Sequence, residues 1–153
     1  MELIKENIQK KRQVWKTDTF YRKKWLFKDL LWLQDHVENL KVITDGYILD
    51  YGSDENSMWV DLKIIEGIPA SKFEHTDEFI KKIYNFCLEQ IERTQPYGHG
   101  DWVLSNIIVN GDKIEMVDWD NLSKHNKSMC MDKLHKDLRS AFGEKFDEVI
   151  SNR

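Results

Sequence analysis

Apolar residues recur at helical spacing in three stretches of the chain. Positions three or four residues apart lie on one face of a helix, so each stripe predicts an amphipathic helix. The first helix is expected from about residue 20 to 39. The second is expected to open at His75-Thr-Asp-Glu78 with a Thr or Asp cap, and the third to run over residues 131–150, weakened by Gly143. The stripes are Leu26, Leu30, Leu33 and Val37; Phe79, Ile83, Phe86, Leu88 and Ile91; and Leu134, Leu138, Phe142, Phe146 and Ile150.

Two pairs of β-rich runs predict antiparallel hairpins. Residues 47–51 and 58–65 flank a polar cluster, and turn-forming residues between two such runs are typical of a hairpin. Residues 107–109 and 113–117 flank Asn110-Gly-Asp112, where Asn-Gly favours a tight hairpin turn. Helices and hairpins together predict an α+β chain.

The second hairpin follows a loop that has polar residues at fixed spacing. Asn106 comes five residues after Asp101, and Asp118 follows the returning strand. The hairpin is therefore expected to bring Asp118 back beside Asn106. Phosphoryl transfer needs such groups, because a carboxylate must accept the hydroxyl proton while amide and carboxylate oxygens hold Mg²⁺ against the nucleotide phosphates. We predict that Asp101 is the catalytic base and that Asn106 and Asp118 are magnesium ligands.

Residues 97–121 resemble the catalytic core of the aminoglycoside phosphotransferase and choline kinase superfamily, relatives of the protein kinases. In that family the loop is His-Gly-Asp-x-x-x-x-Asn and the metal motif is Asp-Trp/Phe-Glu/Asp. This chain has His99-Gly-Asp101 with Asn106, and Asp118-Trp-Asp120. The resemblance implies a protein-kinase-like fold, ATP and Mg²⁺ as cofactors, and a small-molecule hydroxyl as phosphate acceptor. It makes Asp101 and Asn106 the catalytic residues.

The length bounds this expectation, because 153 residues suffice for one compact core but are few for a two-lobed kinase. We expect a single kinase-like domain with a reduced small lobe over 1–65, built from a short antiparallel sheet and one helix. A hinge over 66–69 leads into a mainly helical large lobe over 70–153. By resemblance, Ile65, Glu66, Gly67 and Ile68 bind the adenine edge; an ordinary Gly-Pro loop is the alternative.

Residues 13–16 are expected to form a small-lobe strand, and the resemblance makes Lys16 the candidate for binding the α and β phosphates. The alternative is a lysine that stays solvated. Two features depart from the family pattern. No glycine precedes Gly46, so the Gly-rich phosphate loop is absent. The predicted small-lobe helix has no Glu near its middle, which leaves Asp29 as the candidate partner of the lysine.

Further residues are expected to support the site. His99 is expected to be a buried, hydrogen-bonded residue that braces the loop rather than a proton carrier. Asp120 either contributes to a second Mg²⁺ or caps a turn, and both options stay open. Asp137 matches a family position that braces the catalytic loop, with an exposed helical carboxylate as the alternative. Trp15 and Trp102 are candidates for lining a substrate pocket.

Composition and charge narrow the class of protein. The chain is 41% hydrophobic and 33% charged, which is typical of a soluble globular domain. Residues 1–28 hold nine Lys or Arg against three acids, and the remainder holds fourteen against twenty-four. This basic stretch would hold nucleotide phosphates, bind nucleic acid or form a solvated face. With a net charge of −4, nucleic acid is the least expected partner.

No signal peptide or membrane span is recognised, and Cys87 and Cys130 form no disulfide pattern. We therefore expect a cytoplasmic protein with free thiols. His125, Cys130 and His135 lack a fourth ligand for a zinc site. The sequence predicts an ATP- and Mg²⁺-dependent phosphotransferase. The alternatives are an inactive nucleotide-binding pseudokinase or interaction module, and a nucleic-acid-associated protein; the acceptor and the oligomeric state stay open.

Overall fold

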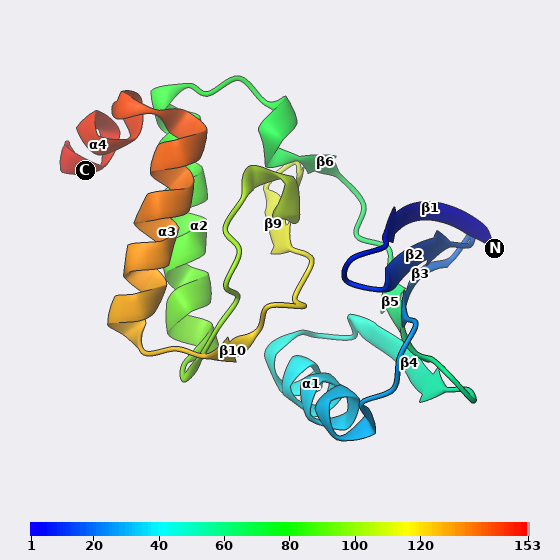
Figure 1. Ribbon diagram of the computed structural model, residues 1–153. Coiled ribbons are helices and arrows are strands. Elements are labelled where there is room, and N and C mark those ends of the chain that lie inside the picture. The colour runs from blue at the N-terminus through cyan, green and yellow to red at the C-terminus, as the bar shows by residue number, and fades with distance from the viewer. Residues whose placement is uncertain (153) are drawn as a thin grey trace. The chain divides into compact units, whose positions relative to one another are not determined.

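The structure, a computed structural model, describes residues 1–152. The chain divides into two units, Met1–Ile64 and a second unit that begins at Ile65 (Figure 1). Each unit contains both helices and antiparallel strands. The chain is therefore an α+β protein, as the sequence predicts.

The first unit is a five-stranded antiparallel sheet with one helix. Its strands are β1 (Glu2–Asn7), β2 (Arg12–Lys16), β3 (Phe20–Trp25), β4 (Ile48–Ser53) and β5 (Met58–Lys63), in the order β1-β2-β3-β5-β4. Helix α1 (Leu30–Ile43) connects β3 to β4. The rings of Trp25 and Trp32 meet edge to face at 5.4 Å. This contact places α1 over the sheet face that carries Trp25.

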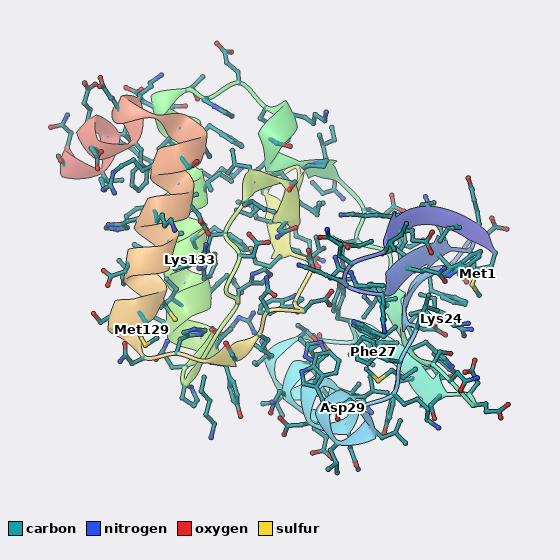
Figure 2. The ribbon with its side chains drawn as sticks, viewed as in Figure 1. Met1, Lys24, Phe27, Asp29, Met129 and Lys133 are labelled. Atoms are coloured by element: carbon teal, nitrogen blue, oxygen red, sulfur yellow. The ribbon has the colours of Figure 1, made fainter. Side chains whose placement is uncertain are left out.

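The helix predicted over residues 20–39 is wrong in its first part. Residues 20–25 form β3, which pairs with β2 and β5, and α1 begins only at Leu30. Asp29 caps this helix by accepting a hydrogen bond from the backbone N–H of Trp32 at 3.1 Å (Figure 2). The strand is favoured by partners far along the chain, because Arg22 pairs with Asp61 of β5 at 2.7 Å.

Two other elements predicted for this unit are confirmed. Strand β2 includes residues 13–16, and β4 and β5 form the predicted antiparallel hairpin. Strand β1 has no counterpart among the predicted elements. Its residues are exposed except Asn7, which is half-buried, so this edge strand lacks the apolar face that would identify it in the sequence.

The second unit combines packed helices with short strands. Helices α2 (Asp77–Thr94), α3 (Lys127–Phe142) and α4 (Glu144–Ser151) contact one another (Figure 1). Strands β6 (Ile68–Pro69), β8 (Ile107–Asn110) and β9 (Lys113–Met116) form one antiparallel sheet, and β7 (Tyr97–Gly98) pairs with β10 (Ser123–Lys124). Short 3-10 helices occupy Ala70–Lys72 and Leu104–Asn106.

The second predicted hairpin and the second predicted helix are confirmed. Strands β8 and β9 pair so that Asn110 faces Lys113, and Gly111 in the turn has a φ of +60°. Thr76 caps α2 by accepting a hydrogen bond from the backbone N–H of Phe79 at 3.1 Å. Both features depend on residues close together in the sequence, which is why the pattern predicts them.

The C-terminal helix is predicted too late and too long. Helix α3 begins at Lys127, where the Asn126 side chain accepts a hydrogen bond from the backbone N–H of Met129 at 2.8 Å. It ends at Phe142, and α4 follows as a separate helix. Gly143 has a φ of +72°, a left-handed conformation that ends helices and that glycine adopts without strain.

Both cysteines are free, as predicted, and both are buried. Burial raises the pKa of the Cys87 thiol far above its usual range, and it also raises the pKa of Cys130. Such thiols are poor nucleophiles, because the reactive form is the thiolate. Over residues 1–152, no helix has the length and apolar character that a membrane crossing requires.

Candidate active site

His99 connects the candidate catalytic loop to the chain just before Asp118. The ring is 1% exposed, and its two nitrogens meet two backbone groups. Nε2 lies 2.8 Å from the carbonyl oxygen of Val117, and Nδ1 accepts the backbone N–H of Asp101 at 3.2 Å. A ring that donates from Nε2 and accepts at Nδ1 is a neutral imidazole. His99 thereby holds the backbone of Asp101.

Asn106 lies at the other end of the same loop and is 7% exposed. Its side-chain nitrogen donates to the carbonyl oxygen of Asp101 at 3.2 Å, which turns the amide oxygen away from that carbonyl. Its own backbone carbonyl accepts the N–H of Val117 at 2.8 Å. Val117, which directly precedes Asp118, is therefore hydrogen-bonded to the backbone of Asn106.

Asp118 has an unusual backbone conformation, with a φ of +60°. Residues other than glycine rarely adopt it, and Asp and Asn tolerate it best. Such a conformation costs about 1–3 kcal/mol and persists only where the surroundings fix it. Here the carbonyl of Val117 meets His99, while the buried indole of Trp119 donates to the carbonyl of Met116 at 3.2 Å. Backbone strain at a candidate metal ligand is the kind of feature that marks functional sites.

Gly100 allows the loop and the metal motif to lie against each other. Its φ is +85°, and a Cβ at this position would come 2.8 Å from the carbonyl oxygen of Asn121. No larger residue fits without a shift of the backbone. The glycine of His99-Gly-Asp101 is thus required by the close passage of the chain that follows Asp118-Trp-Asp120.

Asp137 of α3 also holds the loop. Its Oδ2 accepts the backbone N–H of Trp102 at 3.0 Å, and its Oδ1 pairs with Lys133 at 3.0 Å. Sequence reasoning missed Lys133, although Lys and Asp four residues apart on a predicted helix are expected to interact. The pair links α3 to the residue that follows Asp101.

The remaining candidates have other surroundings. Lys16 is exposed at the end of β2, with its ammonium 5.5 Å from the centre of the Tyr21 ring. Ile65 and Glu66 lie in an irregular stretch, and Ile68 pairs with Val109 in the small sheet. A Cβ on Gly67 would come 2.7 Å from the carbonyl oxygen of Val109. Packing against β8 thus gives a structural reason for this glycine.

The candidate metal ligands are oxygen donors. Among residues 1–152, no three His, Cys, Asp or Glu side chains gather into a metal-binding cluster. Magnesium bound with a nucleotide takes only one or two carboxylates from the protein and completes its shell with water and phosphate oxygens. The amide oxygen of Asn106 and the carboxylate of Asp118 are the hard donors that such a site uses.

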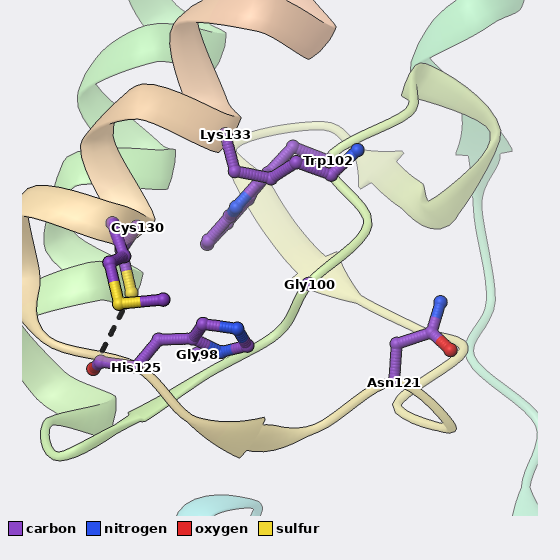
Figure 3. Close-up of a pocket in the computed structure, with 8 residues that line it drawn as sticks. Gly98, Gly100, Trp102, Asn121, His125, Cys130 and Lys133 are labelled. Atoms are coloured by element: carbon purple, nitrogen blue, oxygen red, sulfur yellow. Dashed lines mark hydrogen bonds between the residues drawn. The ribbon is translucent and has the colours of Figure 1, made fainter.

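A pocket of about 360 Å³ opens on the second unit beside the loop (Figure 3). Two loop residues that flank His99, Gly98 and Gly100, form part of its wall. A Cβ on Gly98 would come 2.8 Å from the sulfur of Cys130, so this wall has no space for a side chain. The side chains around the pocket are those of Trp102, Asn121, His125, Met129, Cys130 and Lys133.

No protein-family profile matches the chain, and no curated protein sequence matches it. Solved structures of WbdD do share its fold. A structure of monomeric WbdD gives a TM-score of 0.63 at 13% identity, over 94% of this chain and 40% of that one. A high-resolution WbdD structure gives 0.56 at 15% identity, over 79% and 32% of the two chains. The bifunctional kinase-methyltransferase WbdD at medium resolution gives 0.56 at 16% identity, over 75% and 30%.

These similarities concern the fold. The chain is an α+β protein whose architecture follows that of the WbdD structures over most of its length, which is compatible with a kinase-like fold. The chain spans two fifths or less of the WbdD chains that it matches.

Proposed function

We propose that this protein is an ATP- and Mg²⁺-dependent phosphotransferase that moves the γ-phosphate to a hydroxyl group of a small molecule. The observation that carries the proposal is the hydrogen-bonded arrangement around Val117. Its carbonyl meets His99 and its N–H meets the backbone of Asn106. Asp101, Asn106 and Asp118 are thereby held by one local set of backbone contacts, and phosphoryl transfer depends on such positioning.

Each residue has a stated role in this proposal. Asp101 accepts the proton of the acceptor hydroxyl as the new oxygen–phosphorus bond forms and the bond between the γ-phosphorus and the departing ADP oxygen breaks. Asn106 and Asp118 hold Mg²⁺, which when bound offsets negative charge on the phosphoryl oxygens. His99 and Asp137 keep the loop in place through the backbone N–H groups of Asp101 and Trp102. Asp120 is assigned no separate step.

The fold similarity supports the same choice of chemistry. One of the similar structures is that of a bifunctional kinase-methyltransferase, and the His99-Gly-Asp101 loop with Asn106 favours the kinase among these two activities. In this proposal residues 1–65 are a reduced small lobe, residues 66–69 are the hinge and residues 70–153 are the large lobe. Lys16 then neutralises nucleotide phosphate in place of a glycine-rich loop.

Calorimetric titration of ATP with and without Mg²⁺ tests the nucleotide site. We expect binding that requires Mg²⁺ and that is lost in Asp118→Ala. Asp112→Ala is the matched control, because Asp112 is an exposed carboxylate in the turn of the same hairpin. Binding that persists unchanged in Asp118→Ala, or that disappears equally in the control, would contradict the proposed metal site.

Transfer itself is tested with Asp101→Asn, which keeps the shape of the side chain. Loss of the base should slow Mg²⁺-ATP turnover by about 100-fold or more while leaving nucleotide binding intact. A catalytically inactive nucleotide-binding protein is the second candidate, favoured by the absence of glycine before Gly46. It predicts Asp118-dependent binding together with turnover that is equally negligible in the wild type and in Asp101→Asn.

A further inference from the structure

The pocket beside the catalytic loop combines apolar surface with a few polar groups. Figure 3 shows the indole of Trp102 and the imidazole of His125 facing the same space, with the side chain of Cys130 along one side. The thioether of Met129 also lines the pocket. Aromatic and thioether groups present large, polarisable contact surfaces. Pockets of several hundred Å³ with such lining and a few placed polar groups are typical of small-molecule sites.

The polar groups of the pocket carry positive charge or none. Lys133 and His125 are basic, Asn121 is neutral, and none of the lining residues within 1–152 is acidic. The Lys133 side chain is 42% exposed, whereas its partner Asp137 is 10% exposed. The carboxylate is therefore more buried than the lysine side chain. The Lys133 ammonium has three N–H donors, so it can donate to Asp137 and also to a ligand. His125 is held by Ser123, whose hydroxyl lies 3.1 Å from Nδ1.

The pocket is also connected to the proposed catalytic base. Gly100 and Trp102 line it and flank Asp101 along the chain. Asp137 holds the backbone N–H of Trp102 and pairs with Lys133. A molecule bound beside Lys133 thus lies against the segment that positions Asp101.

We propose that this pocket holds the non-reacting part of the phosphate acceptor, and that the acceptor is an uncharged or negatively charged hydroxyl compound with a flat apolar face rather than a polyamine. The proposal rests on the proposed phosphotransferase function. The flat face packs on Trp102, and a negatively charged or hydrogen-bonding group meets Lys133. A polyamine would bring like charge to Lys133 and find no carboxylate among the lining residues to compensate its own desolvation.

Two series of probes, each with a neutral, an anionic and a cationic member, test this selectivity. One is benzyl alcohol, its para-carboxylate and its para-aminomethyl derivative; the other is glucose, glucuronate and glucosamine. Binding is followed by NMR on the full chain, using the indole signal of Trp102 and the amide signals of His125 and Met129. We expect the anion to bind best and the amine worst, with about threefold between successive members, the size expected for a half-exposed ion pair.

Two substitutions on α3 change the charge of the pocket. Met129→Glu places a carboxylate at the rim, where Met129 is 50% exposed. Met129 is the third residue of α3, and acidic residues are favourable in the first turn of a helix. The side chains of Met129 and Lys133 both extend from α3 (Figure 2). Met129→Glu should reverse the order of binding, and Lys133→Gln should reduce the preference for the anion to near unity. Lys136→Gln is the matched control, because Lys136 is exposed on the same helix outside the pocket.

The outcomes separate this inference from the proposed function. Anion preference that Met129→Glu reverses, and that Lys136→Gln preserves, supports the acceptor pocket. The inference is overturned if the amines bind as tightly as the anions, or if Met129→Glu leaves the order unchanged. It is also overturned if no probe shifts these signals up to about 100 mM, where a millimolar ligand saturates its site. Mg²⁺-dependent ATP binding, measured on the same variants, reports on the nucleotide site alone.

Discussion

The carboxylate of Asp137 should be the strongest single support of the catalytic loop from α3. It accepts the backbone N–H of Trp102 at 3.0 Å, and Trp102 is 1% exposed. A hydrogen bond to a charged acceptor contributes about 1.5–3 kcal/mol. In Asp137→Ala this bond is lost and a backbone donor is left without its partner. The half-exposed ion pair with Lys133 adds less than about 1 kcal/mol.

Alanine offsets part of this loss, because it favours helix by about 0.5 kcal/mol over aspartate. We therefore expect Asp137→Ala to lower the free energy of unfolding by about 2 kcal/mol, a factor of roughly 30 in the equilibrium. Asp137→Asn keeps an acceptor oxygen and should cost about half as much. Urea unfolding measures the global effect, and amide hydrogen exchange at Trp102 measures it at the loop.

Asp132→Ala is the matched control, since Asp132 is an exposed carboxylate of α3 and gains the same helix propensity. Asp137 does not support the loop if the Asp137→Ala protein unfolds at the same urea concentration as Asp132→Ala and exchanges the Trp102 amide at the wild-type rate. Faster exchange at Trp102 with unchanged global stability would instead localise the effect to the loop.

The other predictions concern the supporting fold. Gly111→Ala should cost about 1 kcal/mol from backbone strain alone, because the turn has a φ of +60° with open space around it; an unchanged melting temperature would contradict this. Hydrogen bonding to Arg139 lowers the pKa of Asp147, so their pair stabilises the fold at neutral pH and loses its effect as the pH falls below about 4. Arg139→Gln should therefore unfold at a lower urea concentration than the wild type at pH 7, and the two unfolding midpoints should converge on acidification. Arg22→Met should cost about 2–3 kcal/mol, because Asp61 is only 8% exposed and loses a partner at 2.7 Å; wild-type stability in urea would refute it.

The sequence predicts those elements that local residues determine. The Asn110-Gly111 turn and the Thr76 cap each use contacts within four residues, and both hold in the structure. Residues 20–25 form an element that local residues do not determine. The helix predicted from the stripe that begins at Leu26 is expected to include them, yet they form a strand in which Arg22 pairs with Asp61, 39 residues away, and no local pattern encodes that pairing.

In the candidate site, too, contacts between residues close in the sequence can be predicted and contacts between distant residues cannot. Asp101, Asn106 and Asp118 lie within one short segment, so their spacing alone predicts that a hairpin brings them together. Asp137 reaches the loop through a contact with Trp102 that spans 35 residues. Sequence reasoning reached Asp137 only through family resemblance. The charge of the pocket depends on several separate elements and is evident only in the structure.

Strand β7 pairs with β10, so that Gly98 lies opposite Ser123 and residues 98–123 form a closed loop. This loop contains Asp101, Asn106, Asp118 and Asp120. Their mutual arrangement is therefore a property of one short contiguous segment, which the rest of the second unit supports from outside. Insertions elsewhere in the chain leave the sequence spacing of these residues unchanged, but the loop still needs the carboxylate of Asp137 in α3, which accepts the backbone N–H of Trp102.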